Sequence, residues 1–296
     1  MNKLPIVTIQ GGLGNQLFQW FFAHEILESS EFRLYLNIPV GPVAQIVYDL
    51  GLTPLFNRCE HYKDLVKGDR NLIPRIFDRL WTITFLTPAL RLLGYYRENP
   101  QPGTRAHKTS PRNVIYANGY FQNWKYAEQQ KETIRKELFP ILESYYIDVS
   151  SRFDLSEPYT VIHVRRGDYR TDQNPETRIG SLDDAFFVEW AKDHPSDRLV
   201  LLAEHRRDVE ELILQINPSL VLDNTSTSAW ETLAIMSFAN EILGSNSTLS
   251  WWGAWVASQK GAKAFLPSAW DVNGRFNPDD FIFPMCNSIR PVWEVF

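Results

Sequence analysis

Apolar and polar residues form two different patterns along the second half of the chain. Short runs of apolar residues alternate with longer segments in which apolar residues recur at the spacing of an amphipathic helix. This pattern predicts strands over 159–164, 198–203, 220–222, 241–244 and 263–267, and helices over 181–194, 206–216, 228–239 and 247–258. Ser181 and Asp184 have capping-box spacing at the start of the first helix. Strands that alternate with helices predict a mostly parallel sheet covered on both faces.

The first part of the chain begins with the same alternation. A strand is expected over 5–9, and apolar pairs recur at helical spacing between 17 and 27. Residues 114–138 indicate a strand, a loop and a helix, whereas 40–112 show no regular pattern. The regular alternation begins after "SEP" (156–158). We therefore expect two Rossmann-type α/β domains facing a central cleft, with bounds 1–155 and 156–296.

Open parallel sheets bind ligands beyond the C-terminal ends of their strands, and a glycine-rich stretch, "GGLGNQ" (11–16), follows the first predicted strand. Gly12 and Gly14 allow a ligand to approach the backbone where a helix begins. The amides of Asn15 and Gln16 are suited to sugar hydroxyls. The stretch is neither a dinucleotide fingerprint nor a P-loop. A tight strand–helix turn without a ligand is the alternative.

A second stretch, "HVRRGDY" (163–169), places two arginines at the end of a buried strand. An unpaired buried guanidinium is costly, so each arginine needs an acidic partner or an anionic ligand. The planar fork of arginine matches phosphate oxygens, and a diphosphate is therefore one candidate ligand. Neighbouring residues of an extended segment face opposite ways, so one arginine is expected to bind the ligand and the other to pair internally.

A third stretch, "LGSNSTLSWWGAW" (243–255), combines hydroxyl side chains with the start of a helix. Hydroxyls, free N–H groups and the positive helix end together suit a phosphate. The alternative is an ordinary N-cap formed by Ser245 or Ser247. The three tryptophans of this stretch are interpreted as packing residues. Upstream, Glu231 is placed to accept hydrogen bonds from guanine, or to be an ordinary acid in a first helical turn.

Composition excludes several classes of function. Lys and Arg number 30 against 35 Asp and Glu, a net charge of −5, so nothing indicates nucleic-acid binding. Two cysteines and dispersed histidines indicate neither a disulfide framework nor a zinc site. No Asp-x-Asp pair is present to hold a metal against a diphosphate, so we expect neither a metal nor another cofactor.

The N-terminal residues lack the features of a signal peptide, and we expect a cytoplasmic protein. The segment 67–112 has nine Lys and Arg but three acids. A solvated surface explains this excess, and peripheral contact with an anionic inner membrane or a lipid-linked acceptor is the alternative. The sequence does not indicate an oligomeric state.

Five stretches together resemble the α-1,2-fucosyltransferase family, with more distant similarity to α-1,6- and protein O-fucosyltransferases. They are "GGLGNQLFQ" (11–19), "GYFQNWKY" (119–126), "HVRRGDY" (163–169), "STLSWWGAW" (247–255) and "PSAWD" (267–271). They occur in family order over nearly the whole chain. The pairing of "HVRRGDY" with "SWWGAW" is much more specific than either motif alone.

The resemblance implies a GT-B-like fold and metal-independent, inverting transfer of L-fucose from GDP-β-L-fucose to the 2-hydroxyl of a terminal β-galactoside, in surface-glycan or O-antigen biosynthesis. By motif match, Arg165 binds the diphosphate and His163 and Arg166 support it. The remaining implied contacts are Ser247, Thr248 and Ser250 near the phosphates, Glu231 near guanine, and Asn15 and Gln16 near the sugar or acceptor.

Asp168 is the first candidate for the base that takes the acceptor proton, with Asp172 and Glu204 behind it. The alternative is that Asp168 only holds an arginine in place. This chain departs from the family in having Glu231 where Asp is usual and "AEH" (203–205) where an acidic triplet is usual. Transfer from another GDP-sugar and non-catalytic binding of a sugar nucleotide are the alternative functions.

Overall fold

The computed structural model describes residues 6–27, 32–36, 53–56, 62–67, 80, 87–97, 116–171 and 178–295. The chain divides into two compact units, Met1–Phe139 (unit 1) and Pro140–Phe296 (unit 2). The division falls before the boundary expected at 155/156, so nearly all of helix α8 (Phe139–Phe153) belongs to unit 2. The roles expected for the two domains stay predictions.

Unit 1 contains a five-stranded sheet in the order β3-β2-β1-β5-β4, and its neighbouring strands are parallel. The strands are β1 (Ile6–Ile9), β2 (Phe32–Leu36), β3 (Tyr62–Lys67), β4 (Tyr95–Arg97) and β5 (Tyr116–Asn118). The helices are α1 (Leu13–Leu27), α3 (Thr53–Phe56), α5 (Thr87–Leu92), α6 (Trp124–Gln129) and α7 (Lys131–Glu137). The expected strand over 5–9 and the helix after it are confirmed as β1 and α1. No strand was predicted at the position of β2, and β3 and β4 lie in the stretch 40–112, where the sequence showed no regular pattern.

Helix α1 is the core helix of unit 1. Leu17, Phe18, Phe21 and Phe22 are all buried, as their helical spacing predicts. The ring of Phe22 stacks on Phe121 with centroids 3.6 Å apart, which ties α1 to the loop after β5. The helix therefore fixes the turn that precedes it against that loop.

Unit 2 contains a six-stranded sheet, also with parallel neighbours, in the order β11-β10-β9-β6-β7-β8. The strands are β6 (Thr160–Val164), β7 (Leu199–Ala203), β8 (Leu220–Leu222), β9 (Glu241–Gly244), β10 (Lys263–Pro267) and β11 (Cys286–Ile289). If these six strands are numbered 1 to 6 along the chain, their order across the sheet from β8 to β11 is 3-2-1-4-5-6. This is the order of a Rossmann fold, in which ligands bind where the strand order reverses. In unit 2 that point lies between β6 and β9.

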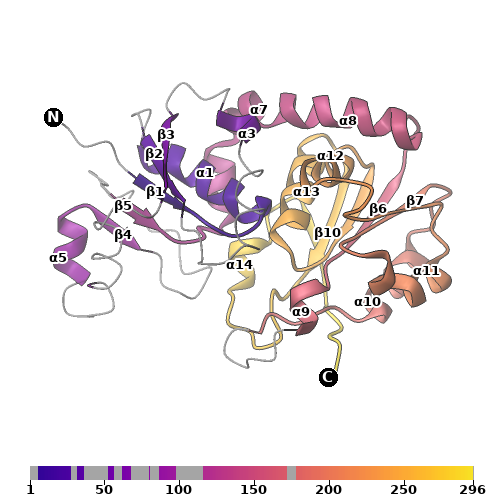
Figure 1. Ribbon diagram of the computed structural model, residues 1–296. Coiled ribbons are helices and arrows are strands. Elements are labelled where there is room, and N and C mark those ends of the chain that lie inside the picture. Colours follow the sequence, from indigo (N-terminus) through magenta and orange to yellow (C-terminus); the bar gives the residue numbers. More distant parts are fainter. Residues whose placement is uncertain are drawn as a thin grey trace. The chain divides into compact units, whose positions relative to one another are not determined.

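Helices cover both faces of the unit 2 sheet (Figure 1). They are α9 (Gly167–Thr171), α10 (Asp184–Asp193), α11 (Glu210–Ile216), α12 (Ala229–Ser237), α13 (Thr248–Gln259) and α14 (Pro278–Phe281), with a 3₁₀ turn at Arg206–Val209. Helices α10 and α11 contact one another, as do α12 and α13, which lie on the other side of the sheet (Figure 1). The expected α/β class with mostly parallel sheets is confirmed.

Two details of the predicted helices are wrong. The expected capping box of Ser181 and Asp184 does not form, because the N-cap of α10 is Asp183, whose side chain accepts from Ala185 N. The helix expected over 206–216 begins instead with the 3₁₀ turn, and its α-helical part starts at Glu210. Strand β11 was not predicted.

Helix α13 is buried on almost every side. Trp251, Trp252 and Trp255 are fully inaccessible, which confirms that these tryptophans pack in the core. Trp251 also donates from Nε1 to the Phe281 carbonyl at 2.7 Å. The helix is therefore held rigidly, and its N-terminus has a fixed position at the end of β9. Within the described residues, no helix has the length and apolar character needed to cross a membrane.

Candidate active site

The structure brings two of the three predicted stretches together at the reversal point of the unit 2 sheet. Strand β6 leads into Arg165, and the adjacent strand β9 leads into Ser245. His163 lies opposite Gly244 in the parallel ladder, and Ser245 N donates to the His163 carbonyl at 3.1 Å. "HVRRGDY" and the Ser-rich stretch therefore leave the sheet side by side.

Arg165 lies between two carboxylates. Its Nη2 donates to Asp168 Oδ1 at 2.7 Å, and its Nη1 is 3.2 Å from Glu204 Oε2. The guanidinium also lies over the ring of Tyr169, 5.6 Å from its centroid. One third of the Arg165 side chain (33 %) is exposed, whereas 66 % of Asp168 is exposed. The contact with Asp168 is thus the outer one, which an anionic ligand can replace most easily.

The Glu204 carboxylate lies close to Gly167, where a side chain would compete with it for space. Gly167 has a φ of +25°, and a Cβ at this position would come within 2.0 Å of Glu204 Oε2. The glycine of "RRGD" therefore leaves space for the carboxylate at the end of β7. Sequence reasoning ranked Glu204 behind Asp168 and did not predict its contact with Arg165.

Arg166 is the more deeply buried arginine of the pair. Its side chain is 4 % exposed; its Nη2 contacts Asp184 Oδ1, and its Nη1 donates to the Asp208 carbonyl at 2.7 Å. Its Nε lies 3.7 Å from Glu294 Oε1. Both arginines thus have acidic partners within unit 2, and Arg165 is the more exposed of the two. That Arg165 alone faces a ligand stays a prediction.

His163 is buried inside unit 2. Its Nδ1 lies 2.6 Å from Ser250 Oγ, which in turn lies 3.2 Å from Ser245 Oγ. Burial, reinforced by the charge of Arg165, lowers the pKa of His163 to about 3. The neutral ring thus links β6 to the first turn of α13. This arrangement favours a supporting role for both His163 and Ser250 over direct contact with a ligand.

The start of α13 is built from a cap and an anchored asparagine. Ser247 is the N-cap, and its Oγ accepts from Leu249 N at 3.3 Å. Asn246 is fully buried and donates from Nδ2 to the carbonyls of Gly180 and Trp270 at 3.0 and 3.1 Å. The Ser247 cap engages the N–H group of Leu249, and Thr248, the first residue of α13, is partly exposed. Sequence reasoning missed Asn246, although it interrupts the serine cluster.

Glu231 has a structural role at the start of α12. It completes a capping box with Ser228, accepting from Ser228 N at 2.6 Å, and its other oxygen accepts from Arg152 Nη2 at 2.7 Å. Burial alone would raise the pKa of Glu231, but the hydrogen bonds from Ser228 and the charge of Arg152 outweigh it and lower the pKa. In the described parts of unit 2, no hydrogen bond or ion pair joins Glu231 to Arg165. The contact between Glu231 and guanine stays a prediction.

Unit 1 has its own reversal point, between β1 and β5, and amide side chains gather there. Gln122 Nε2, from the loop after β5, donates to Asn15 Oδ1 at 2.6 Å. Gln16 is buried and donates to the Gly11 carbonyl at 2.8 Å. Gln19 Nε2 donates to the Gly119 carbonyl at 3.1 Å. The stretches "GGLGNQ" and "GYFQNW" are thus held together, and Gln16 supports the turn while Asn15 is partly exposed.

The two predicted glycines lie at the start of α1. Gly12 is exposed directly before α1, and Gly14 is buried in its first turn. Asp172 lies outside the described residues, as does most of the basic segment 67–112. Among the residues that the structure describes, no group of His, Cys, Asp and Glu has the arrangement of a metal site.

Comparison with known proteins identifies the chain. The model of Glycosyl transferase family 11 matches residues 84–276, well over half of the 296 residues. The protein belongs to this family. The family match contains both stretches at the unit 2 reversal point, so their chemistry belongs to a glycosyltransferase.

The chain is also similar to curated glycosyltransferases and to a solved glycosyltransferase structure. An alpha-1,2-colitosyltransferase of Escherichia coli is 21% identical over 289 residues, 94% of this chain and 96% of the relative. The O-antigen biosynthesis glycosyltransferase WbnK of Escherichia coli is 24% identical over 116 residues, 38% of each chain. A crystal structure of a glycosyl transferase family 9 protein from Veillonella parvula has a TM-score of 0.50 at 13% identity, covering 98% of this chain and 86% of that one. The expected GT-B-like fold class is confirmed.

Proposed function

We propose that this family 11 glycosyltransferase transfers L-fucose from GDP-β-L-fucose to the 2-hydroxyl of a terminal β-galactoside, with inversion and without a metal. Family membership and the five stretches that resemble α-1,2-fucosyltransferases support this assignment. The similarity to an O-antigen glycosyltransferase supports a role in surface-glycan synthesis. In this proposal unit 2 binds the donor, and the amide-lined edge of unit 1 contributes contacts to the acceptor.

The observation that carries the proposal is the place of Arg165. It is a partly exposed arginine at the reversal point of a Rossmann-ordered sheet, beside a strand that leads into the capped N-terminus of α13. A guanidinium and a helix N-terminus both favour negative charge, and together they suit the two phosphates of GDP. The diphosphate would replace Asp168 as the outer partner of Arg165, while Glu204 remains the inner one.

The same groups favour the transition state of an inverting displacement. As the acceptor oxygen forms its bond to the anomeric carbon, the bond to the leaving phosphate oxygen breaks and that oxygen gains negative charge. Arg165 and the N–H groups of α13 are already fixed in position, so they stabilise this charge without reorganising. His163 and Arg166 contribute by holding strand ends and loops, since both are buried.

The acceptor proton needs a destination, and Asp168 is the first candidate. Its carboxylate is mostly exposed, and it loses its hydrogen bond to Arg165 when the diphosphate binds. A transition state with strong oxocarbenium character would need little help from a base. A pH–rate profile of Asp168→Asn distinguishes the two roles, because loss of the acidic limb indicates a base and its retention indicates a residue that only holds Arg165.

The direct test is incubation with GDP-β-L-fucose, a panel of β-galactosides and EDTA, followed by analysis of the product linkage. An α-1,2-linked fucoside formed in EDTA is the expected product. A product with another linkage, or transfer that stops in EDTA and returns with a divalent metal, would contradict the corresponding part of the proposal.

A different donor sugar is the second candidate, because the relative of nearly the same length is named as a colitosyltransferase. Competition between GDP-β-L-fucose and GDP-colitose at equal concentration measures the preference directly. Calorimetry with GDP, UDP and NAD adds a check on the nucleotide. Binding of GDP without turnover of any GDP-sugar would instead favour a non-catalytic sugar-nucleotide binding protein.

A further inference from the structure

Residues 292–294 are fixed against residues 181–183 within unit 2. Leu182 and Trp293 form an antiparallel bridge. Asp183 N donates to the Val292 carbonyl at 2.9 Å, and Glu294 N donates to the Ser181 carbonyl at 2.9 Å. This pairing gives the backbone at Glu294 a defined position, although no regular strand was predicted there.

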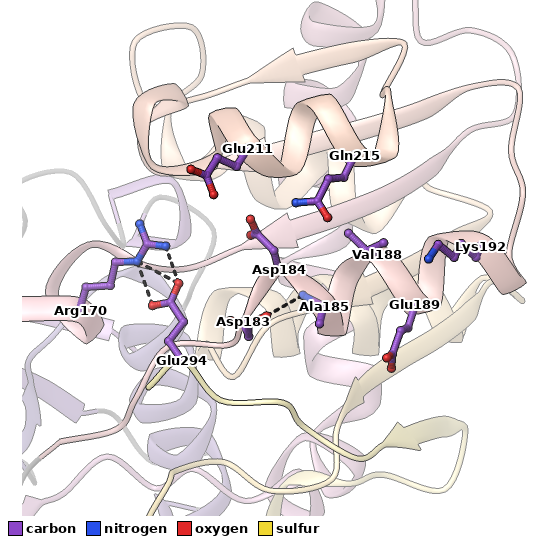
Figure 2. A pocket seen from close by; sticks show the side chains of 10 residues that line it. All are labelled: Arg170, Asp183, Asp184, Ala185, Val188, Glu189, Lys192, Glu211, Gln215 and Glu294. Carbon is purple, nitrogen blue, oxygen red and sulfur yellow. Dashed lines mark hydrogen bonds and ion pairs between the residues drawn. The ribbon is translucent and has the colours of Figure 1, made fainter. Parts of the chain in front are cut away.

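The Glu294 carboxylate is shared by two arginines. Arg170 Nε lies 3.1 and 2.9 Å from the two carboxylate oxygens, and its Nη2 also contacts Oε1 (Figure 2). Arg166 Nε lies 3.7 Å from the same Oε1, and the Glu294 side chain is only 10 % exposed. Burial alone would raise the pKa of Glu294, but the hydrogen bonds from Arg170 and the charge of Arg166 outweigh it and lower the pKa. Glu294 is therefore an ionised, partly buried partner of both cations.

The two arginines flank the residues that hold Arg165. Helix α9 has five residues, which is too short to be stable without external anchors. It carries Asp168 and Tyr169, and both contact Arg165. Arg166 precedes α9, Arg170 lies in its last turn, and both donate to the Asp208 carbonyl, at 2.7 and 3.4 Å. Anchoring these two side chains therefore anchors the whole helix.

We propose that Glu294 is a positioning residue of the donor site: by binding Arg166 and Arg170 it fixes α9 and so orients Arg165. Glu294 is not expected to touch the donor, since its carboxylate is engaged by the arginines. Its kinetic consequence rests on the proposed function, whereas its effect on α9 does not.

The kinetic test compares Glu294→Gln with a matched control. Glu211 lines the same pocket as Glu294 (Figure 2), and within the described residues no ion pair joins it to either arginine. Because α9 shifts when the shared charge is lost, Glu294→Gln is expected to lower kcat/KM for GDP-fucose by about 100-fold. Glu211→Gln should behave as wild type, and Glu294→Asp should recover part of the loss because it restores the charge.

A role confined to stability predicts a different result. Val149→Ala, which truncates a fully buried side chain on α8, provides a variant that is destabilised away from α9. When it is assayed well below its melting temperature, its kcat should equal that of the wild type. If Glu294→Gln is equally folded and loses no more activity than Val149→Ala, the positioning role is wrong.

Hydrogen exchange tests the structural step without any substrate. Amides of residues 166–171 should exchange about tenfold faster in Glu294→Gln than in wild type or Glu211→Gln, because α9 opens locally. Unchanged exchange in this segment would overturn the inference. If wild type shows this protection but no transfer from GDP-fucose, the proposed function fails while the anchoring of α9 stands.

Discussion

The two units each have a parallel sheet with a reversal point, but the side chains at these points differ in charge. In unit 2, Arg165 lies between Asp168 and Glu204. In unit 1, the corresponding edge has amide side chains, of which Gln122 donates to Asn15. Among the described residues, the side-chain contacts at the unit 1 point involve no ion pair.

This difference indicates what each edge can bind. Charged groups that are held in place before a ligand arrives suit a ligand that carries or develops charge. Neutral amides offer donors and acceptors to hydroxyl groups without requiring a counter-charge. In the proposed function, similar strand topology would serve two ligands, and the residues that follow the strands would determine which one binds.

Arg165→Ala is the substitution expected to have the largest effect. Removing a fixed donor to developing charge should lower kcat by about 1,000-fold and weaken GDP binding, while the fold survives. The measurement is steady-state kinetics together with calorimetry with GDP. Arg198 provides the control, because its side chain is 32 % exposed and pairs with Asp154. A folded Arg165→Ala protein with near-normal kcat would remove this arginine from the mechanism.

Gly167→Ala should have a smaller effect, through Glu204. The added Cβ would meet Glu204 Oε2 at 2.0 Å, so the carboxylate must move away from Arg165. We expect kcat/KM for the donor to fall about tenfold, which corresponds to roughly 1.4 kcal/mol. Kinetics of the double variant Gly167→Ala/Glu204→Ala decide the cause. If the alanine acts by displacing Glu204, it should add little to Glu204→Ala, whereas independent, additive losses would point to backbone strain alone.

Substitutions at the unit 1 edge should affect the acceptor and spare the nucleotide. Gln122→Ala removes the amide that orients Asn15, and loss of one such hydrogen bond costs about 1 kcal/mol. KM for the β-galactoside should therefore rise about fivefold, with GDP affinity unchanged. Gln129→Ala, at an exposed position on α6, is the control. A weaker affinity for GDP in Gln122→Ala would contradict the division of ligands between the two edges.

Titration of His163 is expected to have no effect on activity near neutral pH. Its pKa of about 3 lies below the ordinary value near 6.5, so the folded protein keeps the ring neutral where the unfolded chain binds a proton. The buried ring therefore lowers the free energy of unfolding as the pH falls from about 6.5 towards 3, by up to about 1.4 kcal/mol per pH unit. Above pH 6.5 it has no effect on the pH dependence of stability. Denaturant unfolding of wild type and His163→Asn at pH 7 and pH 5 measures this difference.

The charge at the unit 2 edge should therefore come from arginine and not from histidine. An inflection of kcat near pH 6.5 that disappears in His163→Asn would show that the ring is accessible and titrates during turnover.

Local sequence patterns predicted the elements that depend on local spacing. Strand β6 and helix α13 follow from apolar runs and helical periodicity, and the places of Arg165 and Ser247 at strand ends follow from the alternation of elements. The interpretation of the α13 tryptophans as packing residues is confirmed by their burial. The irregular stretch 40–112 hid β3 and β4, because three of the six residues of β3 are charged and β4 has only three residues.

Contacts between distant residues could not be predicted in the same way. The order of the strands depends on pairing between segments far apart, and the single sequence contains no signal for it. The partners of Arg166 are Asp184 and Glu294, and nothing in local spacing connects them. Asp168 was ranked ahead of Glu204 because it lies within the heptad "HVRRGDY", whereas the contact between Glu204 and Arg165 joins two different strand ends.

The ion pair between Arg170 and Glu294 joins residues 124 positions apart, and this separation has a consequence for protein synthesis. Domains fold as their residues emerge from the ribosome, so β6 and α9 become available long before Glu294 has been translated. The nascent chain can form most of the unit 2 sheet while Arg166 and Arg170 still lack their shared carboxylate. Ribosome-bound chains with an added C-terminal linker that brings residue 294 out of the exit tunnel should therefore retain GDP better than chains in which residue 294 is still inside the tunnel.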